Sequence, residues 1–193
     1  MNADILVVGI GGQGVMTAAE ILARTALGAG LDVTKTEVAG MSQRGGVVCS
    51  QVRIATKVHA CEIAKGSADL LIALEPAEAL RWAPWLALHG AVVVNTTRAV
   101  PPVVSSGLHQ YPADPLAGLR ALGHATQAID ATQRAADLGD ARLLSTVMLG
   151  AAAARLPFAP AALREQLALR FAANPRVSQL NAQAFDTGLH GMH

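Results

Sequence analysis

Short apolar runs alternate with segments of helical periodicity along this chain. The first run, at 5–8, is apolar throughout, which predicts a central parallel strand buried on both faces. From Val15 onward the apolar positions recur at helical spacing, and glycines at 28 and 30 mark the end of that helix. The chain therefore starts with a strand, a glycine-rich turn and a helix.

The same alternation continues to the C-terminus. Further strands are expected at 32–38, 70–74, 91–94 and 126–129, and helices at 76–82, 114–122, 141–155, 160–172 and 176–185. Mixed polar and apolar residues at 47–54 and 58–63 flank a polar turn and predict a β-hairpin. The pattern predicts a single α/β domain over 1–193 with a Rossmann-like, mostly parallel sheet. Helices are expected on both faces, with a β-hairpin insertion and a helical C-terminal region that packs on the domain from about 141.

Composition narrows the classes of partner. Of the 193 residues, 52% are hydrophobic and 15% are charged, which leaves apolar surface for a protein partner beyond a large core. A formal net charge of +1 offers no electrostatic basis for binding nucleic acid or a membrane surface. No apolar run reaches the length of a membrane span and the N-terminus does not resemble a signal peptide, so the cytoplasm is the expected location.

Cysteine and histidine positions bear on cofactors. The two cysteines, Cys49 and Cys61, form no C-x-x-C pair, and the histidines are scattered. An iron–sulfur cluster normally takes four thiolates and structural zinc takes four Cys or His ligands. We therefore expect no metal site and no cofactor bound by this chain alone.

The first candidate site is the turn after the first strand, Gly9-Ile10-Gly11-Gly12-Gln13-Gly14. It contains G-x-G-x-x-G between a strand and a helix, the context of nucleotide-binding turns. Glycine lets the backbone approach an anion, and the helix N-terminus supplies free N–H groups and partial positive charge. The candidate residues for binding a phosphate group are Gly9, Gly11, Gly12, Gln13 and Gly14. The alternative is a turn that only packs helix against strand.

Glu37 is the candidate for a dinucleotide site. It follows the glycines by about 20 residues, the separation at which NAD enzymes place a ribose-binding acid. The alternative is an ordinary carboxylate at a strand end. Because no Tyr-x-x-x-Lys or His–Asp pair follows, no catalytic residue is assigned.

A second glycine-containing loop follows the 32–38 strand. Its residues are Gly40, Met41, Ser42, Gln43, Arg44, Gly45 and Gly46. An arginine among small residues can present its guanidinium to a carboxylate or phosphate, and the glycine pair permits close approach of another chain. We expect this loop to face a partner, the alternative being an ordinary solvated loop.

The two glycine loops together resemble the gamma domain of the pyruvate/2-oxoacid:ferredoxin oxidoreductase family. Glu75 and the segments 67–71, 78–82, 92–95 and 100–102 fit the resemblance, which covers about 4–188. Within the family the chain is most similar to the beta subunits of the indolepyruvate:ferredoxin enzymes. The family pattern leads us to expect histidine at position 39, and Ala39 departs from it.

The resemblance implies oxidative decarboxylation of a 2-oxo acid, such as the aryl pyruvate indolepyruvate, to an acyl-CoA. It implies a large partner subunit that holds thiamine diphosphate, Mg²⁺ and iron–sulfur clusters, with CoA as co-substrate and ferredoxin reduced by the complex. This chain would be a subunit without a cofactor, inactive alone. Two alternatives stay open: a free-standing NAD(P) oxidoreductase that uses the 9–14 turn and Glu37, and an assembly module whose glycine loop binds nothing.

Overall fold

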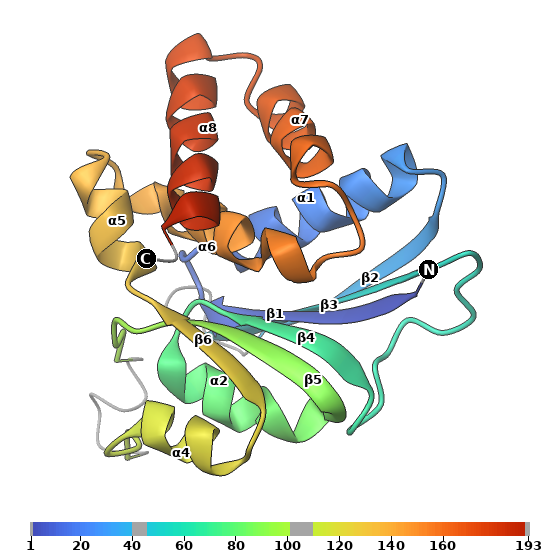
Figure 1. Ribbon diagram of the computed structural model, residues 1–193, viewed down its shortest axis with the longest axis vertical. Helices are drawn as coiled ribbons and strands as arrows, with labels where there is room; N and C mark the ends of the chain where they lie inside the picture. The colour runs from blue at the N-terminus through green and yellow to red at the C-terminus, as the bar shows by residue number, and fades with distance from the viewer. Residues whose placement is uncertain (1, 40–45, 101–109, 192–193) are drawn as a thin grey trace.

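Six strands form one sheet in the order β2-β3-β1-β4-β5-β6 (Figure 1). The computed structural model describes residues 2–39, 46–100 and 110–191. The strands are β1 (Ala3–Ile10), β2 (Asp32–Ala39), β3 (Val47–Ala55), β4 (Ala68–Ala73), β5 (Leu86–Asn95) and β6 (Ala125–Ile129). β1, β4, β5 and β6 are parallel, and only β3 runs against its neighbours, so the mostly parallel sheet is confirmed.

Helices cover both faces of the sheet, as expected. They are α1 (Val15–Gly28), α2 (Pro76–Trp82), α4 (Pro115–Ala121), α5 (Ala131–Asp137), α6 (Leu144–Ala152), α7 (Pro160–Arg170) and α8 (Pro175–His190). Three single 3-10 turns, η1 (Ala83–Trp85), η2 (Ala141–Leu143) and η3 (Ala153–Arg155), flank α2 and α6. In Figure 1, α2 and α4 lie on one face, and α1, α6, α7 and α8 lie on the other. Within the described part of the chain, no helix is both long and apolar enough to cross a membrane.

Side-chain caps set where several helices begin. The Asp114 carboxylate accepts the Ala117 N–H at 2.9 Å at the start of α4. Asp130 accepts the Gln133 N–H at 3.0 Å in the same way at the start of α5. Each such cap contributes about 1 kcal/mol by satisfying an N–H group that has no partner inside the helix.

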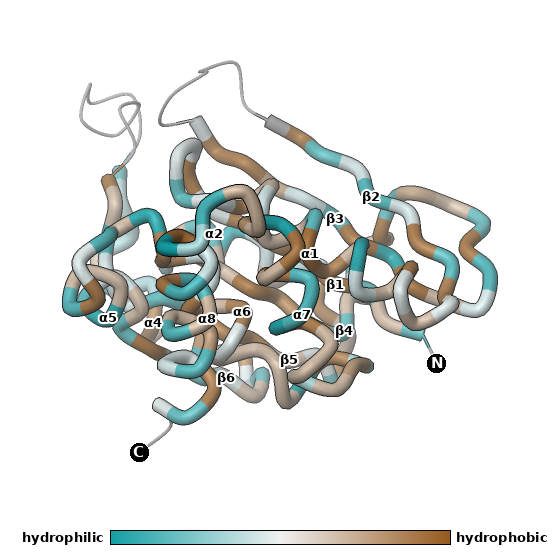
Figure 2. Tube along the Cα trace, turned by 90° about the horizontal axis from the view of Figure 1, so that it is seen from above, coloured by the Kyte–Doolittle hydropathy of each residue, from teal (hydrophilic) through white to brown (hydrophobic). Residues whose placement is uncertain are grey.

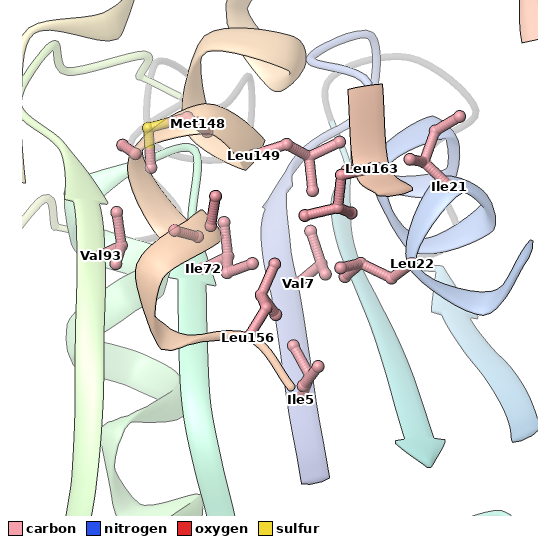
Figure 3. Packing of buried hydrophobic residues seen from close by; sticks show 14 of the residues in the cluster. Ile5, Val7, Ile21, Leu22, Ile72, Val93, Met148, Leu149, Leu156 and Leu163 are labelled. Atoms are coloured by element: carbon pink, nitrogen blue, oxygen red, sulfur yellow. The ribbon is translucent and has the colours of Figure 1, made fainter. Parts of the chain in front are cut away.

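The strands bury alternate side chains in two cores. The core toward α1, α6 and α7 is drawn in Figure 3, where Ile5 and Val7 of β1 and Ile72 of β4 meet Leu22 of α1 and Leu149 of α6. The opposite core is smaller and lies against α2 and α4. In Figure 2 the middle strands are largely brown, and teal lies mostly on outer turns and helix surfaces. A sheet buried on both faces explains the continuous apolar runs in the sequence.

The predicted hairpin of 47–54 with 58–63 is wrong. β3 pairs with β1 on one side and with β2 on the other, so it has no free edge for a further strand. The hairpin in this fold is β2–β3. Residues 58–63 form no strand, and Ile63 is buried in the smaller core, where its N–H donates to Gln51 Oε1 at 2.6 Å.

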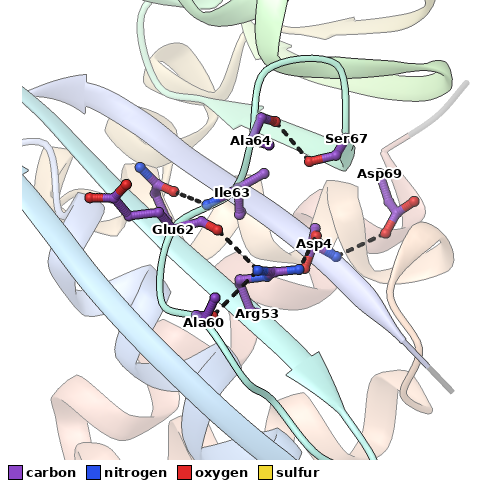
Figure 4. A network of polar contacts seen from close by, with 9 residues as sticks. Asp4, Arg53, Ala60, Glu62, Ile63, Ala64, Ser67 and Asp69 are labelled. Carbon is purple, nitrogen blue, oxygen red and sulfur yellow. Dashed lines mark hydrogen bonds and ion pairs between the residues drawn. The ribbon is translucent and has the colours of Figure 1, made fainter.

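Arg53 holds this non-strand segment in place (Figure 4). Its Nε and Nη2 donate to the two oxygens of Asp4 at 2.9 and 3.0 Å. Its Nη1 donates to the carbonyl oxygens of Ala60 and Glu62 at 3.4 and 3.0 Å. One guanidinium therefore links β1, β3 and the connection to β4, using the fork geometry that lysine lacks.

Helices α6 and α8 cross with their backbones in contact, which attaches the C-terminal helical region to the sheet. A Cβ added to Gly150 would lie 2.1 Å from the Phe185 carbonyl oxygen, and one added to Gly188 would lie 2.0 Å from that of Val147. Neither helix can take a side chain at this crossing without moving apart.

We predict that Gly188→Ala destabilises the protein. Separating the two helices opens the packing around buried Phe185 and should lower the free energy of unfolding by about 1–3 kcal/mol or more. The control is Gly28→Ala at the end of α1, whose added Cβ would meet only Gln166 Nε2 at 3.5 Å. Urea unfolding of both variants tests this, and equal midpoints would show that the crossing tolerates a side chain.

Candidate functional site

The glycine turn after β1 needs glycine at two positions for backbone reasons. Gly12 has φ 103° and Gly14 has φ 90°, in the region that L side chains rarely adopt. A Cβ on Gly14 would also lie 2.5 Å from Ser145 Oγ, so this glycine lets α1 begin directly against α6. Gly11 has no such positive φ. Its backbone N–H donates to the Gly46 carbonyl oxygen at 2.8 Å.

Gln13 folds back over the end of β1. Its Oε1 accepts the Ile10 N–H at 2.8 Å, and its Nε2 donates to the Leu74 carbonyl oxygen at 3.3 Å. A Cβ on Gly9 would lie 2.7 Å from Gln13 Oε1, so glycine at that position makes room for the amide. Gly9 and Gln13 therefore hold the turn and the end of β4 together.

A cavity of about 320 Å³ opens beside the turn, between the N-terminus of α1 and helices α6 and α8. Of the predicted site residues, Gly12 and Gly14 line it. Its other lining residues are Thr17, Asp140, Arg142, Leu143, Ser145, Thr146, Phe171, Val177, Leu180 and Asn181. Those from 140 onward were not predicted, because they lie far along the chain and no local pattern marks them.

The end of the cavity at α1 favours an anion. No side chain caps α1, and its first turn has no acidic residue. The first-turn N–H groups therefore lack a side-chain cap, and Gly14 and Thr17 at this positive end of the helix dipole line the cavity, as at phosphate-binding helix N-termini. The hydroxyl-bearing residues Thr17 and Ser145 line the same space.

Arg142 and Asp140 form an ion pair in the wall of the cavity. Arg142 Nη2 lies 2.6 Å from Asp140 Oδ2, and 86% of the arginine side chain is exposed. The Arg142 side chain, followed by its backbone N–H, lowers the pKa of Asp140 to about 2. The carboxylate is therefore charged at neutral pH and competes with any anion for the guanidinium.

The far wall, from α8 and the turn before it, is mostly apolar. Asn181 is the polar exception, and its hydrogen bonds lie within the protein: it accepts from Thr146 Oγ1 at 2.6 Å and donates to the Val177 carbonyl oxygen at 2.9 Å. The cavity thus combines a polar, anion-favouring end with an apolar end.

Two buried carboxylates, Glu75 and Glu78, follow the C-terminal end of β4. Glu75 is fully buried and accepts the N–H of Glu78 at 3.0 Å and of Ala99 at 3.4 Å, together with the Tyr111 hydroxyl. Glu75 therefore binds chain on either side of 101–109. The oxygens of Glu75 are thus used to hold the fold.

Glu78 and Cys49 are both buried, and the charge of Glu78 affects the pKa of Cys49. Burial raises the pKa of Glu78 to about 7 against the lowering effect of Arg81, and Glu75 adds to the rise. Burial, with a further contribution from Glu78, raises the pKa of the Cys49 thiol to about 12. Because the thiolate is the reactive form, Cys49 is inert.

The strand order moves Glu37 away from the glycine turn. In a dinucleotide fold the acidic residue lies on the strand next to β1. Here β3 lies between β1 and β2, so Glu37 is two strands, or roughly 10 Å, from β1. Its carboxylate pairs with Lys35 Nζ at 2.8 Å. This arrangement disfavours the NAD(P) alternative.

Of the second loop, only Gly46 lies within the described residues. Gly40, Met41, Ser42, Gln43, Arg44 and Gly45 lie outside them. The hydrogen bond between Gly11 and Gly46 joins the last residue of the second loop to the glycine turn.

Comparisons with known proteins find similarity along nearly the whole chain. Residues 4–190 match the family model described as pyruvate ferredoxin/flavodoxin oxidoreductase. Two proteins named indolepyruvate oxidoreductase subunit IorB are similar. The one from Archaeoglobus fulgidus is 38% identical, with 97% of this chain and 94% of that protein covered. The one from Pyrococcus horikoshii is 35% identical, with 96% and 94% covered.

Solved structures share the fold. The gamma subunit of a keto/oxoacid ferredoxin oxidoreductase from Geobacter sulfurreducens aligns with a TM-score of 0.70 at 23% identity, covering 97% of this chain and 96% of that one. The 2-oxoglutarate:ferredoxin oxidoreductase from Magnetococcus marinus aligns with a TM-score of 0.75 at 22% identity, and this chain spans 30% of its length. The chain belongs to the pyruvate ferredoxin/flavodoxin oxidoreductase family.

Proposed function

We propose that this chain is the small subunit of a cytoplasmic, thiamine-dependent 2-oxoacid:ferredoxin oxidoreductase that acts on aryl pyruvates such as indolepyruvate. The observation that carries the proposal is the similarity over nearly the full length to subunits named for that activity. The reaction is oxidative decarboxylation to an acyl-CoA with reduction of ferredoxin.

The cofactors of this reaction belong to a large partner subunit. An iron–sulfur cluster takes four thiolates, whereas this chain has two cysteines, of which Cys49 is buried as a protonated thiol. Among the described residues, no group of three His, Cys, Asp or Glu side chains could hold a metal ion. The thiamine diphosphate, Mg²⁺ and iron–sulfur clusters are therefore assigned to the partner.

The cavity beside the glycine turn is proposed to hold part of CoA. CoA carries phosphates next to a long, weakly polar chain, which matches the α1 N-terminus at one end and the α8 wall at the other. A volume of about 320 Å³ is at the small end of ligand sites, so only part of the molecule fits and the rest extends toward the partner.

The loop over 40–46 is proposed to face the thiamine-bearing subunit. Gly46, at its end, is bonded to the glycine turn. The apolar residues Met16 and Val38, on the elements that follow β1 and precede the loop, are 54% and 53% exposed. Exposed apolar side chains near an arginine loop favour a protein partner at this edge.

An assembly module that binds no CoA is the second candidate. Gln13 favours it, because its side chain occupies backbone groups at the turn that a nucleotide site leaves open. The two candidates differ in whether the cavity contributes to the affinity for CoA.

We predict that the purified chain is colourless and has no activity toward 2-oxo acids until the large subunit is added. The physical reason is the missing set of thiolates. Absorption spectra and ferredoxin reduction, with and without the partner, test this. Visible absorption by the pure chain or turnover without a partner would remove the subunit proposal, and tight NAD binding in calorimetry would revive the dehydrogenase.

We predict opposite effects from the two members of the cavity ion pair. Arg142→Gln removes a cation and should raise the KM for CoA of the assembled complex roughly two- to tenfold, about 0.5–1.5 kcal/mol. Asp140→Asn removes the competing carboxylate and should lower that KM. Arg120→Gln, on α4 at the other face of the sheet, is the control. If all three variants keep the wild-type KM, the cavity does not hold CoA and the assembly module is favoured.

We predict that Arg44→Ala weakens the complex without destabilising the chain. Loss of a desolvated arginine pair should cost about 2–5 kcal/mol of association, and a pair at the rim far less. Thermal melting of the free chain and activity after titration with the large subunit are the two measurements. Early melting of the free variant would mean that Arg44 serves the internal structure, and the interface proposal would fall.

A further inference from the structure

The two edges of the sheet differ in how they are protected. β2, at one edge, carries Asp32, Lys35 and Glu37, and charges on an edge strand discourage pairing with another chain. β6, at the other edge, reads Ala-Thr-Gln-Ala-Ile over 125–129, with neither a charged residue nor proline. Its residues are exposed or half-exposed except Ile129. Figure 1 shows β6 as the outermost strand on its side, near the C-terminal end of the chain.

At this edge of the sheet, backbone N–H and C=O groups of β6 have no neighbouring strand to bond in the residues that the structure describes. The Ile129 carbonyl oxygen accepts the Thr96 N–H at 3.0 Å on the β5 side. Because parallel strands alternate the direction of their polar groups, Thr126 and Ala128 direct N–H and C=O away from β5. Outside the strand ladder, no group of the described residues bonds these four backbone atoms. Such a pattern is the template for strand addition.

A groove of about 500 Å³ runs along the same edge and carries positive charge. It is lined by Thr126, Gln127, Ala128, Ile129, Arg134, Arg155 and Gly191. Two of these residues are arginines and none is acidic. Arg134 is fixed by donating to the Thr187 and Gly191 carbonyl oxygens at 3.1 and 2.6 Å. Arg155 is exposed and forms no ion pair or hydrogen bond with the described residues.

We propose that an extended acidic segment of a partner protein adds to β6 as a seventh strand. The free backbone groups at 126 and 128 supply the ladder, and the two guanidinium groups select carboxylate side chains on the added segment. The five residues of β6 match a segment of about the same length, roughly 17 Å. The inference rests on β6 and its groove alone and does not depend on the reaction proposed above.

A second copy of this chain fits the edge less well. Pairing β6 with β6 of another copy brings the arginines of both grooves to one seam without a lining carboxylate. A cationic segment meets the same repulsion. The charge of the groove therefore favours an acidic segment over either occupant.

The probes are a seven-residue peptide of alternating valine and glutamate and the matching peptide of valine and lysine. Each is titrated into the isotope-labelled full chain, and the amide NMR signals of Thr126 and Ala128 are followed. We expect the glutamate peptide to shift both signals and to bind at least tenfold more tightly than the lysine peptide. Unshifted signals at both positions up to millimolar glutamate peptide would overturn the proposal.

Two variants separate the ladder from the charge. Ala128→Pro removes an outward N–H that the β5 ladder does not use, so we expect the fold to be kept and binding of the glutamate peptide to fall at least tenfold. Arg155→Glu should reverse the preference between the two peptides, whereas Arg120→Glu on α4 should leave it unchanged. Binding that survives Ala128→Pro would exclude strand addition.

Two further measurements keep the test decisive. If Ala128→Pro does not fold, a glutamate peptide N-methylated at alternate residues replaces it, and undiminished binding of that peptide overturns the ladder. Sedimentation of the free chain tests the second copy: a dimer that Ala128→Pro dissociates would assign the edge to self-association and overturn the acidic partner.

Discussion

The register between β1 and β3 is the constraint on which the rest of the site depends. Ile10 pairs with Val47 and Gly9 with Val48, so the residues that follow β1 and precede β3 are directly opposite each other. Gly11 and Gly46 meet there through a backbone hydrogen bond. This antiparallel pairing brings Gly46, the last residue of the second loop, to the glycine turn and at the same time places a strand between β1 and β2.

The same insertion distinguishes this fold from a dinucleotide-binding one. A Rossmann enzyme uses the strand beside β1 to carry its ribose-binding acid, and here that neighbour is β3. Glu37 is displaced to the edge strand and paired with Lys35. The glycine turn is thus present without an acidic residue on β3, the strand between β1 and β2.

Polar groups that resemble catalytic candidates are used to hold the fold. Glu75 anchors chain on either side of 101–109, and Arg53 fixes the connection between β3 and β4. Asn95 accepts the Ala131 N–H at 3.0 Å and donates to the Leu74 carbonyl oxygen at 3.1 Å, joining β4, β5 and α5. The oxygens of Glu75, the guanidinium of Arg53 and the amide of Asn95 therefore join segments that are distant in the sequence.

The sequence by itself determined the alternation of strands and helices, the mostly parallel sheet and the glycine turn before α1. Those features depend on local periodicity, on caps such as Asp130 and on the conformational freedom of glycine at positions such as Gly14. Only the tertiary structure decided which strands β3 pairs with. The mixed polar and apolar residues of β3 are equally compatible with pairing to 58–63 or to β2. It also decided that Arg142 and Asn181 line the cavity. The crossing of α6 and α8 at Gly150 and Gly188 brings this part of the chain to the N-terminus of α1. Contacts between distant segments leave no periodic signal, since each residue only has to fit a surface that the rest of the chain creates.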